Sequence, residues 1–160
     1  MRSPAAARLE LVAGGLLFDL LSPFLPGAHP DDLAFAFGPH GKPFLPDAPE
    51  IHFSLSHTRG LAMAVVASVP VGCDVERTDR SFQPALVRRV FSPAERTRFS
   101  ALPEPDRPGE FFRVWTLKEA YLKALGTGFQ TDPSTLDVSL LPSTPVPAPP
   151  PYAAAIALLP

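Results

Sequence analysis

The pentapeptide GCDVE, residues 72–76, places two carboxylates directly after a short apolar run. Successive side chains of an extended strand point to opposite faces, so Gly72, Asp74 and Glu76 are expected on one face. The apolar residues that alternate with them would form the other face. Two like charges on one face repel each other, and a cation between them would relieve the repulsion. Taken alone, the pentapeptide is more typical of a strand with a solvated acidic face.

The composition indicates a globular protein. Of the 160 residues, 46% are apolar and 19% are charged, which suits one compact domain or two small lobes that share a core. The net charge of −2 gives no general attraction to nucleic acid or to an anionic membrane. The single cysteine, Cys73, excludes an internal disulfide and fits a reducing compartment, so we expect a cytoplasmic protein.

The segment most similar to a membrane span covers residues 9–25. Glu10, Asp19 and Pro23 interrupt it before it reaches the roughly 20 apolar residues that a span requires. It also lacks the basic start and the cleavage site of a secretory signal. We therefore predict a buried amphipathic helix over 5–21 and no membrane partner.

The first half of the chain combines loop and strand patterns. Residues 22–50 are rich in proline and glycine and are expected to be loop, with a short strand at 33–37. Residues 51–57 alternate apolar and polar side chains, which is typical of a half-buried strand. The apolar run 61–69 predicts a buried strand. With 72–76, these segments predict consecutive antiparallel strands.

The second half is mainly helical. We predict helices over 83–91, 92–102 and 110–126. Ser92, Pro93 and Glu95 form a capping-box pattern at the start of the second helix. Gly126 and Gly128 end the third helix. After it we expect a strand at 136–141, an exposed proline-rich loop at 142–151 and a final strand at 152–159.

The last and strongest of these helices carries a second group of charges. Glu119 and Lys123 are four residues apart and share a face, as in an ordinary surface ion pair. Lys118 precedes Glu119, so two ammonium groups could accompany this carboxylate. Joined to Asp74 and Glu76, Glu119 would complete a three-carboxylate shell for Mg²⁺, and the lysines would neutralise phosphate. Such an arrangement suits phosphoryl transfer.

Four motifs follow one another in a fixed order: GKP (41–43), FSLSHT (53–58), GCDVE (72–76) and WTLKEAYLKALG (115–126). Together they resemble the 4′-phosphopantetheinyl transferases of the Sfp type. The resemblance implies an α+β fold, an α/β pseudo-two-fold, in which two small lobes each pack an antiparallel sheet on a long helix. We expect one domain, with an N-terminal lobe at 1–70 and a C-terminal lobe at 71–160. Because the motifs arrive early, the first lobe is expected to be shortened.

The resemblance also implies an activity: transfer of the phosphopantetheine arm of coenzyme A to a serine of an apo carrier protein, with release of adenosine 3′,5′-bisphosphate. Glu119 would be a candidate base for that serine, directly or through water, and Lys123 would stabilise the transferring phosphate and the leaving group. The implied Mg²⁺ ligands are Asp74, Glu76 and Glu119. The implied contacts of coenzyme A are Lys42 and Pro43 at the adenine and 3′-phosphate end, and Ser56, His57, Asp74, Lys118 and Lys123 at its phosphates.

Several residues also have simpler structural interpretations. His57 could cap a turn, and Trp115 is expected in the core. Glu95 occupies the acidic position of the family's FxxxE segment, but the capping box explains it, and we leave it out of the metal shell. Cys73 is expected to be a small core residue.

The resemblance is incomplete, and other functions stay open. Ser54 and Thr58 stand where Asn and Ser are common in the family. A shortened first lobe could weaken coenzyme A binding and expose sheet edges, which a homo-oligomer could cover. A carrier-binding descendant without activity and a metal-dependent nucleotide phosphohydrolase are the alternatives, although the intact acids and lysines argue against the first. The carrier and its pathway leave no readable motif.

Overall fold

The computed structural model describes residues 15–27, 29 and 33–160. Residues 15–21 are helical and continue into a 3₁₀ turn, η1 (Ser22–Phe24). The end of the predicted helix is thus confirmed, and its first ten residues, 5–14, lie outside the described residues. Leu17 and Leu21 are buried in one cluster with Phe53.

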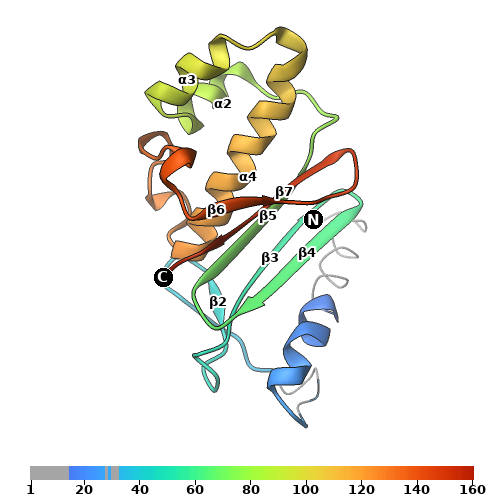
Figure 1. The fold of residues 1–160 in the computed structure, drawn as a ribbon. Helices are drawn as coiled ribbons and strands as arrows, with labels where there is room; N and C mark the ends of the chain where they lie inside the picture. Colours follow the sequence, from blue (N-terminus) through green and yellow to red (C-terminus); the bar gives the residue numbers. More distant parts are fainter. Residues whose placement is uncertain (1–14, 28, 30–32) are drawn as a thin grey trace, which may run out of the picture.

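The strands form three small antiparallel sheets (Figure 1). The first is the short hairpin of β1 (Ala36–Phe37) and β2 (Pro43–Phe44), and the second is the hairpin of β3 (His52–Thr58) and β4 (Leu61–Ala67). The third contains β5 (Val71–Arg77), β6 (Ser143–Val146) and β7 (Tyr152–Leu158) in the order β5-β7-β6. The mixture of helices with small antiparallel sheets confirms the expected α+β class.

Three α-helices lie between β5 and β6 in the sequence: α2 (Pro84–Val90), α3 (Pro93–Ser100) and α4 (Arg107–Leu125). Short 3₁₀ turns accompany them: η3 (Glu104–Asp106), η4 (Gly128–Gln130), η5 (Pro133–Thr135) and η6 (Val138–Leu140). The capping box of Ser92 and Glu95 is present at the start of α3, and Gly126 ends α4 with a left-handed φ of 72°. The predicted helices are therefore confirmed.

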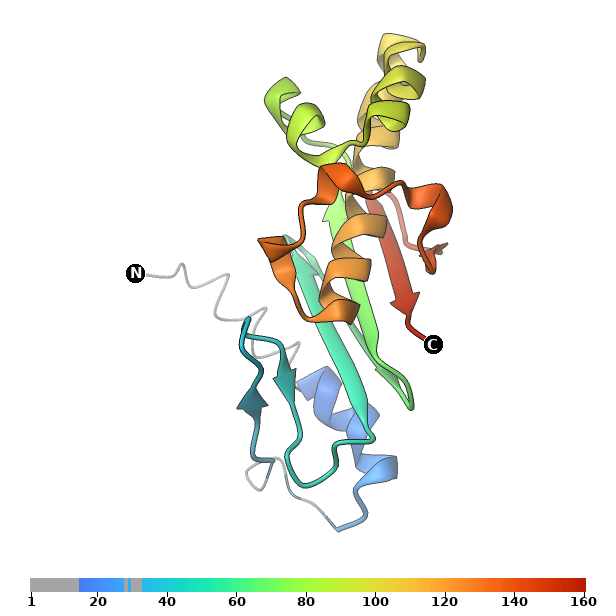
Figure 2. The ribbon, with the colours of Figure 1, turned by 90° about the vertical axis from the view of Figure 1, so that its left-hand side faces the viewer.

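Helix α4 lies against one face of the β5-β7-β6 sheet (Figures 1 and 2). The two elements approach closely at Gly72, because a Cβ atom there would lie 2.0 Å from the carbonyl oxygen of Ala120 and 2.4 Å from the main-chain nitrogen of Ala124. Asp74 and Glu76 share this strand face with Gly72. The two carboxylates of GCDVE therefore face the helix that carries Glu119.

Strand β5 lies between β7 and β3, but β3 and β5 belong to different sheets (Figure 1). Two serine hydroxyls of β3 join them: Ser54 Oγ accepts a hydrogen bond from Cys73 N at 3.1 Å, and Ser56 Oγ accepts one from Val75 N at 3.2 Å. The expected pairing of β5 with the preceding strand is therefore wrong, since β5 pairs with β7. The half-buried pattern expected for β3 is wrong as well, because both serines are buried.

Two further predictions fail near the C-terminal end. Residues 138–140 form the turn η6 and no strand, because Asp137 accepts a hydrogen bond from Ser139 N and Glu95 accepts one from Val138 N. Part of the expected proline-rich loop is strand β6, which lies at the sheet edge, where Pro145 is tolerated. In the described part of the chain, no helix is long and apolar enough to cross a membrane.

Candidate active site

Asp74 on β5 and Lys123 on α4 form an ion pair at the junction of sheet and helix. Lys123 Nζ donates to Asp74 Oδ1 at 2.7 Å. The Asp74 side chain is only 7% exposed, whereas that of Lys123 is 32% exposed. The lysine thus neutralises a buried carboxylate and still has donors directed toward solvent or a ligand.

The second oxygen of Asp74 is left without a partner. Among the buried side-chain oxygen and nitrogen atoms of the described residues, only Asp74 Oδ2 and Ser143 Oγ lack a hydrogen bond. A buried carboxylate oxygen without a donor is unfavourable. This atom therefore marks a place where a bound cation would supply the missing interaction.

Glu119 lies in the same electrostatic environment. Burial and then the Asp74 carboxylate raise its pKa to about 7, with Lys123 opposing and Glu76 adding to the rise. Within the described part of the chain, its carboxylate makes no side-chain hydrogen bond or ion pair. Glu119 is thus a half-buried acid that can change its protonation state near neutral pH.

Glu76 is at the edge of this group. Its Oε2 accepts a hydrogen bond from Arg80 at 2.7 Å. Burial raises its pKa, Arg80 lowers it, and Asp74 raises it. The structure therefore brings Glu76 near Asp74 but pairs it with an arginine.

The donor set fits a hard divalent cation. Asp74 supplies a buried oxygen without a hydrogen bond, and Glu119 supplies a carboxylate without a side-chain partner. Glu76 supplies a third carboxylate, which interacts electrostatically with the other two. Within the described residues no three acidic, histidine or cysteine side chains already lie close enough together to hold a metal ion. The three carboxylates are therefore not arranged as a metal site in this structure, and Arg80 engages one oxygen of Glu76.

Two cavities adjoin the end of α4. One, of about 240 Å³, is lined by residues that include Lys42, Pro43, Leu122 and Lys123. The other, of about 420 Å³, also contains Lys42 and Pro43, with His52 and Phe53 among its other residues. The predicted contacts Lys42 and Pro43 thus lie on the cavity that Lys123 reaches.

The ammonium group of Lys42 also holds the end of α4 against β5. It donates to the carbonyl oxygens of Ala124 at 2.7 Å and Val71 at 3.1 Å. A cation at the C-terminal carbonyls of a helix is favourable. Burial lowers the pKa of Lys42. Lys42 therefore has a structural role in addition to any ligand contact.

Ser56 and His57, two predicted contacts of coenzyme A, differ in burial: Ser56 is buried and His57 is exposed. The Ser56 hydroxyl donates to Asp74 Oδ1 at 2.8 Å and is buried. Its only proton is therefore donated to Asp74, and the hydroxyl has no proton left for a phosphate in this structure. His57 is exposed and lines neither of the two cavities.

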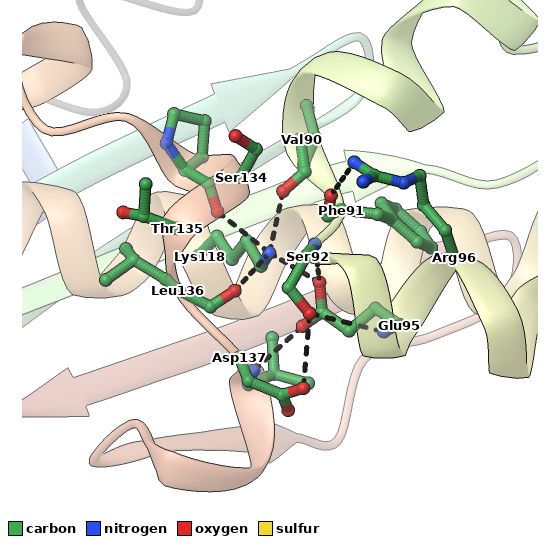
Figure 3. A network of polar contacts seen from close by, with 12 residues as sticks. Val90, Phe91, Ser92, Glu95, Arg96, Lys118, Ser134, Thr135, Leu136 and Asp137 are labelled. Carbon is green, nitrogen blue, oxygen red and sulfur yellow. Dashed lines mark hydrogen bonds and ion pairs between the residues drawn. The ribbon is translucent and has the colours of Figure 1, made fainter.

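Lys118 is the clearest correction of the predicted site (Figure 3). Its side chain is 1% exposed and its ammonium lies 2.5 Å from Glu95 Oε2. It also donates to the carbonyl oxygens of Val90, Pro133 and Leu136 at 2.6, 2.9 and 2.8 Å. An ammonium group has three donors, so none remains for a phosphate. Lys118 is a structural residue that ties α2, α3 and the segment after α4 together.

The simpler interpretations of Glu95 and Cys73 agree with the structure, whereas Trp115 lies only partly in the core. Glu95 is buried in its capping box and in the ion pair with Lys118. Cys73 is fully buried, and burial raises the pKa of its thiol to about 11. Trp115 is half-buried and stacks on Phe111 at the edge of the aromatic core.

Sequence reasoning missed two contributors to the site. Arg80 neutralises Glu76 from four residues along the chain, beyond the end of β5, and no spacing rule for strands would have indicated it. Gly72 lets α4 approach, and its place in GCDVE on the carboxylate face was a signal that could have been used.

Comparison with known proteins agrees with this geometry. A model of the 4′-phosphopantetheinyl transferase superfamily matches residues 70–149, half of the chain, which include Asp74, Glu119 and Lys123. The chain belongs to this superfamily. The transferase HetI of Nostoc sp. is 35% identical over 144 residues, which are 86% of this chain and 60% of that protein. The transferase Sfp of Bacillus subtilis is 29% identical over 109 residues, 68% of this chain and 48% of that protein.

The chain thus spans about half the length of the superfamily relatives that it matches. Among solved structures, Thermotoga maritima holo-[acyl-carrier-protein] synthase is similar to it over 55% of this chain and 61% of that chain. That similarity has a TM-score of 0.43 and a sequence identity of 21%. The family assignment rests on the sequence matches.

Proposed function

We propose that this protein transfers the 4′-phosphopantetheine arm of coenzyme A to a serine of an apo carrier protein and releases adenosine 3′,5′-bisphosphate. The observation that carries the proposal is the ion pair of Asp74 with Lys123 beside the free carboxylate of Glu119, in a member of the phosphopantetheinyl transferase superfamily. An ion pair with a purely structural role does not require a neighbouring acid whose pKa is near 7. A residue that takes up and releases a proton during a reaction works best when its own pKa is in this range.

We propose Asp74, Glu76 and Glu119 as the ligands of a Mg²⁺ ion. When bound, the ion would neutralise the charge of the coenzyme A pyrophosphate. Asp74 Oδ2 is the strongest argument for it, because this buried oxygen otherwise has no partner. Lys123 would donate its remaining N–H groups to the transferring phosphate and to the leaving 5′-phosphate.

Glu119 is the proposed base for the carrier serine. In the metal-free protein its pKa is raised to about 7, whereas a bound cation would favour the ionised carboxylate, which is the form that accepts a proton. The proton would pass from the serine hydroxyl to Glu119, either directly or through a water molecule, as the serine oxygen attacks the β-phosphorus. The bond from that phosphorus to the bridging oxygen then breaks, and the electron pair leaves with adenosine 3′,5′-bisphosphate.

The cavities at the end of α4 are the proposed binding place for the nucleotide end of coenzyme A. Lys42, Pro43 and Lys123 line one of them, so a polyanion there would lie beside two basic side chains. His57, which is exposed but lines neither cavity, is proposed as a further phosphate contact. A cytoplasmic location is proposed from the single, unpaired cysteine.

Incubation of the protein with an apo carrier protein, coenzyme A and Mg²⁺ tests the proposal. A carrier that gains the mass of one phosphopantetheine arm supports it, provided that EDTA abolishes the gain. Free phosphate without carrier modification would identify a phosphohydrolase. Carrier binding without any mass change would identify a non-catalytic descendant. E119Q is the matched variant, because it keeps the size of the side chain and removes its charge.

A further inference from the structure

Ser54 and Ser56 occupy equivalent positions on β3, two residues apart on one face of the strand. Each hydroxyl accepts a hydrogen bond from a main-chain N–H group of β5, Ser54 from Cys73 and Ser56 from Val75. Both side chains are buried. The two serines therefore have the same structural role: each accepts a hydrogen bond from a main-chain N–H group of β5 that has no carbonyl partner in a paired strand.

Their donated hydrogen bonds differ. Ser56 donates its proton to Asp74 Oδ1 at 2.8 Å, whereas Ser54 makes no hydrogen bond to Asp74. Asp74 Oδ1 thus receives two hydrogen bonds, from Ser56 and from Lys123. Asp74 Oδ2 receives none.

We infer that Ser56 is a positioning residue, which orients the Asp74 carboxylate so that Oδ2 faces the metal site. This inference rests on the proposed function, in which Asp74 is a metal ligand. The Ser56 hydroxyl also accepts a hydrogen bond from Val75 N, in the same strand that carries Asp74. This bond fixes the position of the hydroxyl, so that its proton is directed toward Asp74 Oδ1. With Oδ1 held by Ser56 and Lys123, the carboxylate cannot turn to offer Oδ1 in place of Oδ2.

The alternative role of Ser56, a direct contact with coenzyme A, is inconsistent with these contacts. Its single proton points to Asp74, and one of its acceptor positions is taken by Val75 N. A residue that orients a metal ligand commonly contributes tenfold or more to metal affinity without touching the metal. Ser56 therefore acts through Asp74.

Metal binding to the full chain, in the absence of coenzyme A and carrier, tests this role. Mn²⁺ replaces Mg²⁺ because free Mn²⁺ is measured directly by electron paramagnetic resonance. S56A is expected to weaken Mn²⁺ binding about tenfold or more. S54A, which loses the equivalent bond to a β5 N–H group, should stay within about twofold of the wild type, and S56T, which keeps a hydroxyl, should stay within about threefold. Equal affinities of S56A and S54A would overturn the inference.

A double-mutant cycle in EDTA separates this inference from the proposed function. S56A and D74A are expected to be coupled by about fivefold or more in the unfolding equilibrium constant, and S54A and D74A by less than about twofold. If the wild type neither binds Mn²⁺ nor modifies a carrier, the proposed function fails, while coupling still shows that Ser56 holds Asp74. Absence of coupling overturns the inference even if transfer occurs. S56C, which has a similar shape but a weak donor, replaces S56A if that variant does not fold.

Discussion

A Cβ atom on Gly72 would lie 2.0 Å from the carbonyl oxygen of Ala120, so helix α4 runs directly against the main chain of β5. This close approach sets the spacing between the strand that carries Asp74 and the helix that carries Glu119 and Lys123. A larger residue at position 72 would separate the two elements. The ion pair of Asp74 and Lys123, at 2.7 Å, depends on their closeness.

G72A is therefore expected to destabilise the protein by about 3 kcal/mol, because the atoms that its methyl group would meet are main-chain atoms that cannot move independently. Urea unfolding measures the change. G109A is the control, since Gly109 lies on the same helix and a Cβ there would meet nothing within 4 Å. It should stabilise the protein by about 0.5 kcal/mol. Similar stabilities of the two variants would contradict the close packing.

The pKa of Glu119 predicts a pH dependence of stability in the metal-free protein. Because the pKa is raised from 4.5 to about 7, the folded state holds a proton between these values that the unfolded state has lost. Stability from this group is therefore present below pH 4.5 and is lost as the pH rises to 7. The loss has an upper limit of about 3 kcal/mol.

Urea unfolding in EDTA at pH 5 and pH 8 measures this effect. The wild type should lose more stability between the two values than E119Q, which cannot ionise. A smaller or equal loss in the wild type would show that the pKa of Glu119 is not raised. When Mg²⁺ replaces EDTA, the wild type should regain much of the stability that it loses at pH 8, because the bound cation favours the ionised carboxylate of Glu119.

Lys118 is expected to be essential for stability. K118M leaves the carboxylate of Glu95 buried without its counter-ion, and three carbonyl oxygens lose a donor. Breaking a buried pair in this way costs about 3–5 kcal/mol. R113A is the control on the same helix, because Arg113 pairs with Glu110 at the surface, and its loss should cost less than about 1 kcal/mol.

Thermal unfolding of the two variants separates them. If K118M were as stable as the wild type and lost only coenzyme A affinity, Lys118 would be a ligand contact after all. That result would restore the role that the sequence motif suggested for it.

Lys123 is expected to contribute to the reaction itself. K123A should lower the rate of carrier modification by about 100-fold, the usual cost of removing one donor to a developing charge. Carrier mass spectrometry over time measures the rate, and circular dichroism checks the fold. R113A serves again as the control and should keep the wild-type rate. A loss of less than about threefold in K123A would exclude Lys123 from charge stabilisation.

The faces that carry the charged residues were predictable because a strand repeats every two residues and a helix every three to four. Those periods place Asp74 beside Gly72 and Lys123 beside Glu119 whatever the surroundings are. The ion pair of Asp74 with Lys123 was not predicted, because it joins a strand to a helix 49 residues further along the chain. The partner of β5 was not predictable, since β7 is more than 70 residues away and its alanine-rich sequence specifies no register. The burial of Ser54 and Ser56 on β3 could not be predicted either, because alternating apolar and polar side chains indicate a half-buried strand.

Lys118 could not be placed from sequence either. It is adjacent to Glu119, and a helix puts adjacent residues about 100° apart, so one faces the sheet edge and the other the α2–α3 side. The acceptors that surround Lys118 are main-chain carbonyls of Val90, Pro133 and Leu136. Every residue has a main-chain carbonyl group, so the sequence does not show which of them will surround a lysine.

The position of β7 in the middle of its sheet has a consequence for biosynthesis. Strand β5 is translated about 80 residues before β7, and β7 is the neighbour to which it is hydrogen-bonded. While the ribosome is still adding the intervening helices, one edge of β5 has no partner strand. Asp74 and Glu76 then lie on a strand whose sheet has not yet formed. The acidic pair can therefore acquire its final arrangement only after residues 152–158 have left the exit tunnel.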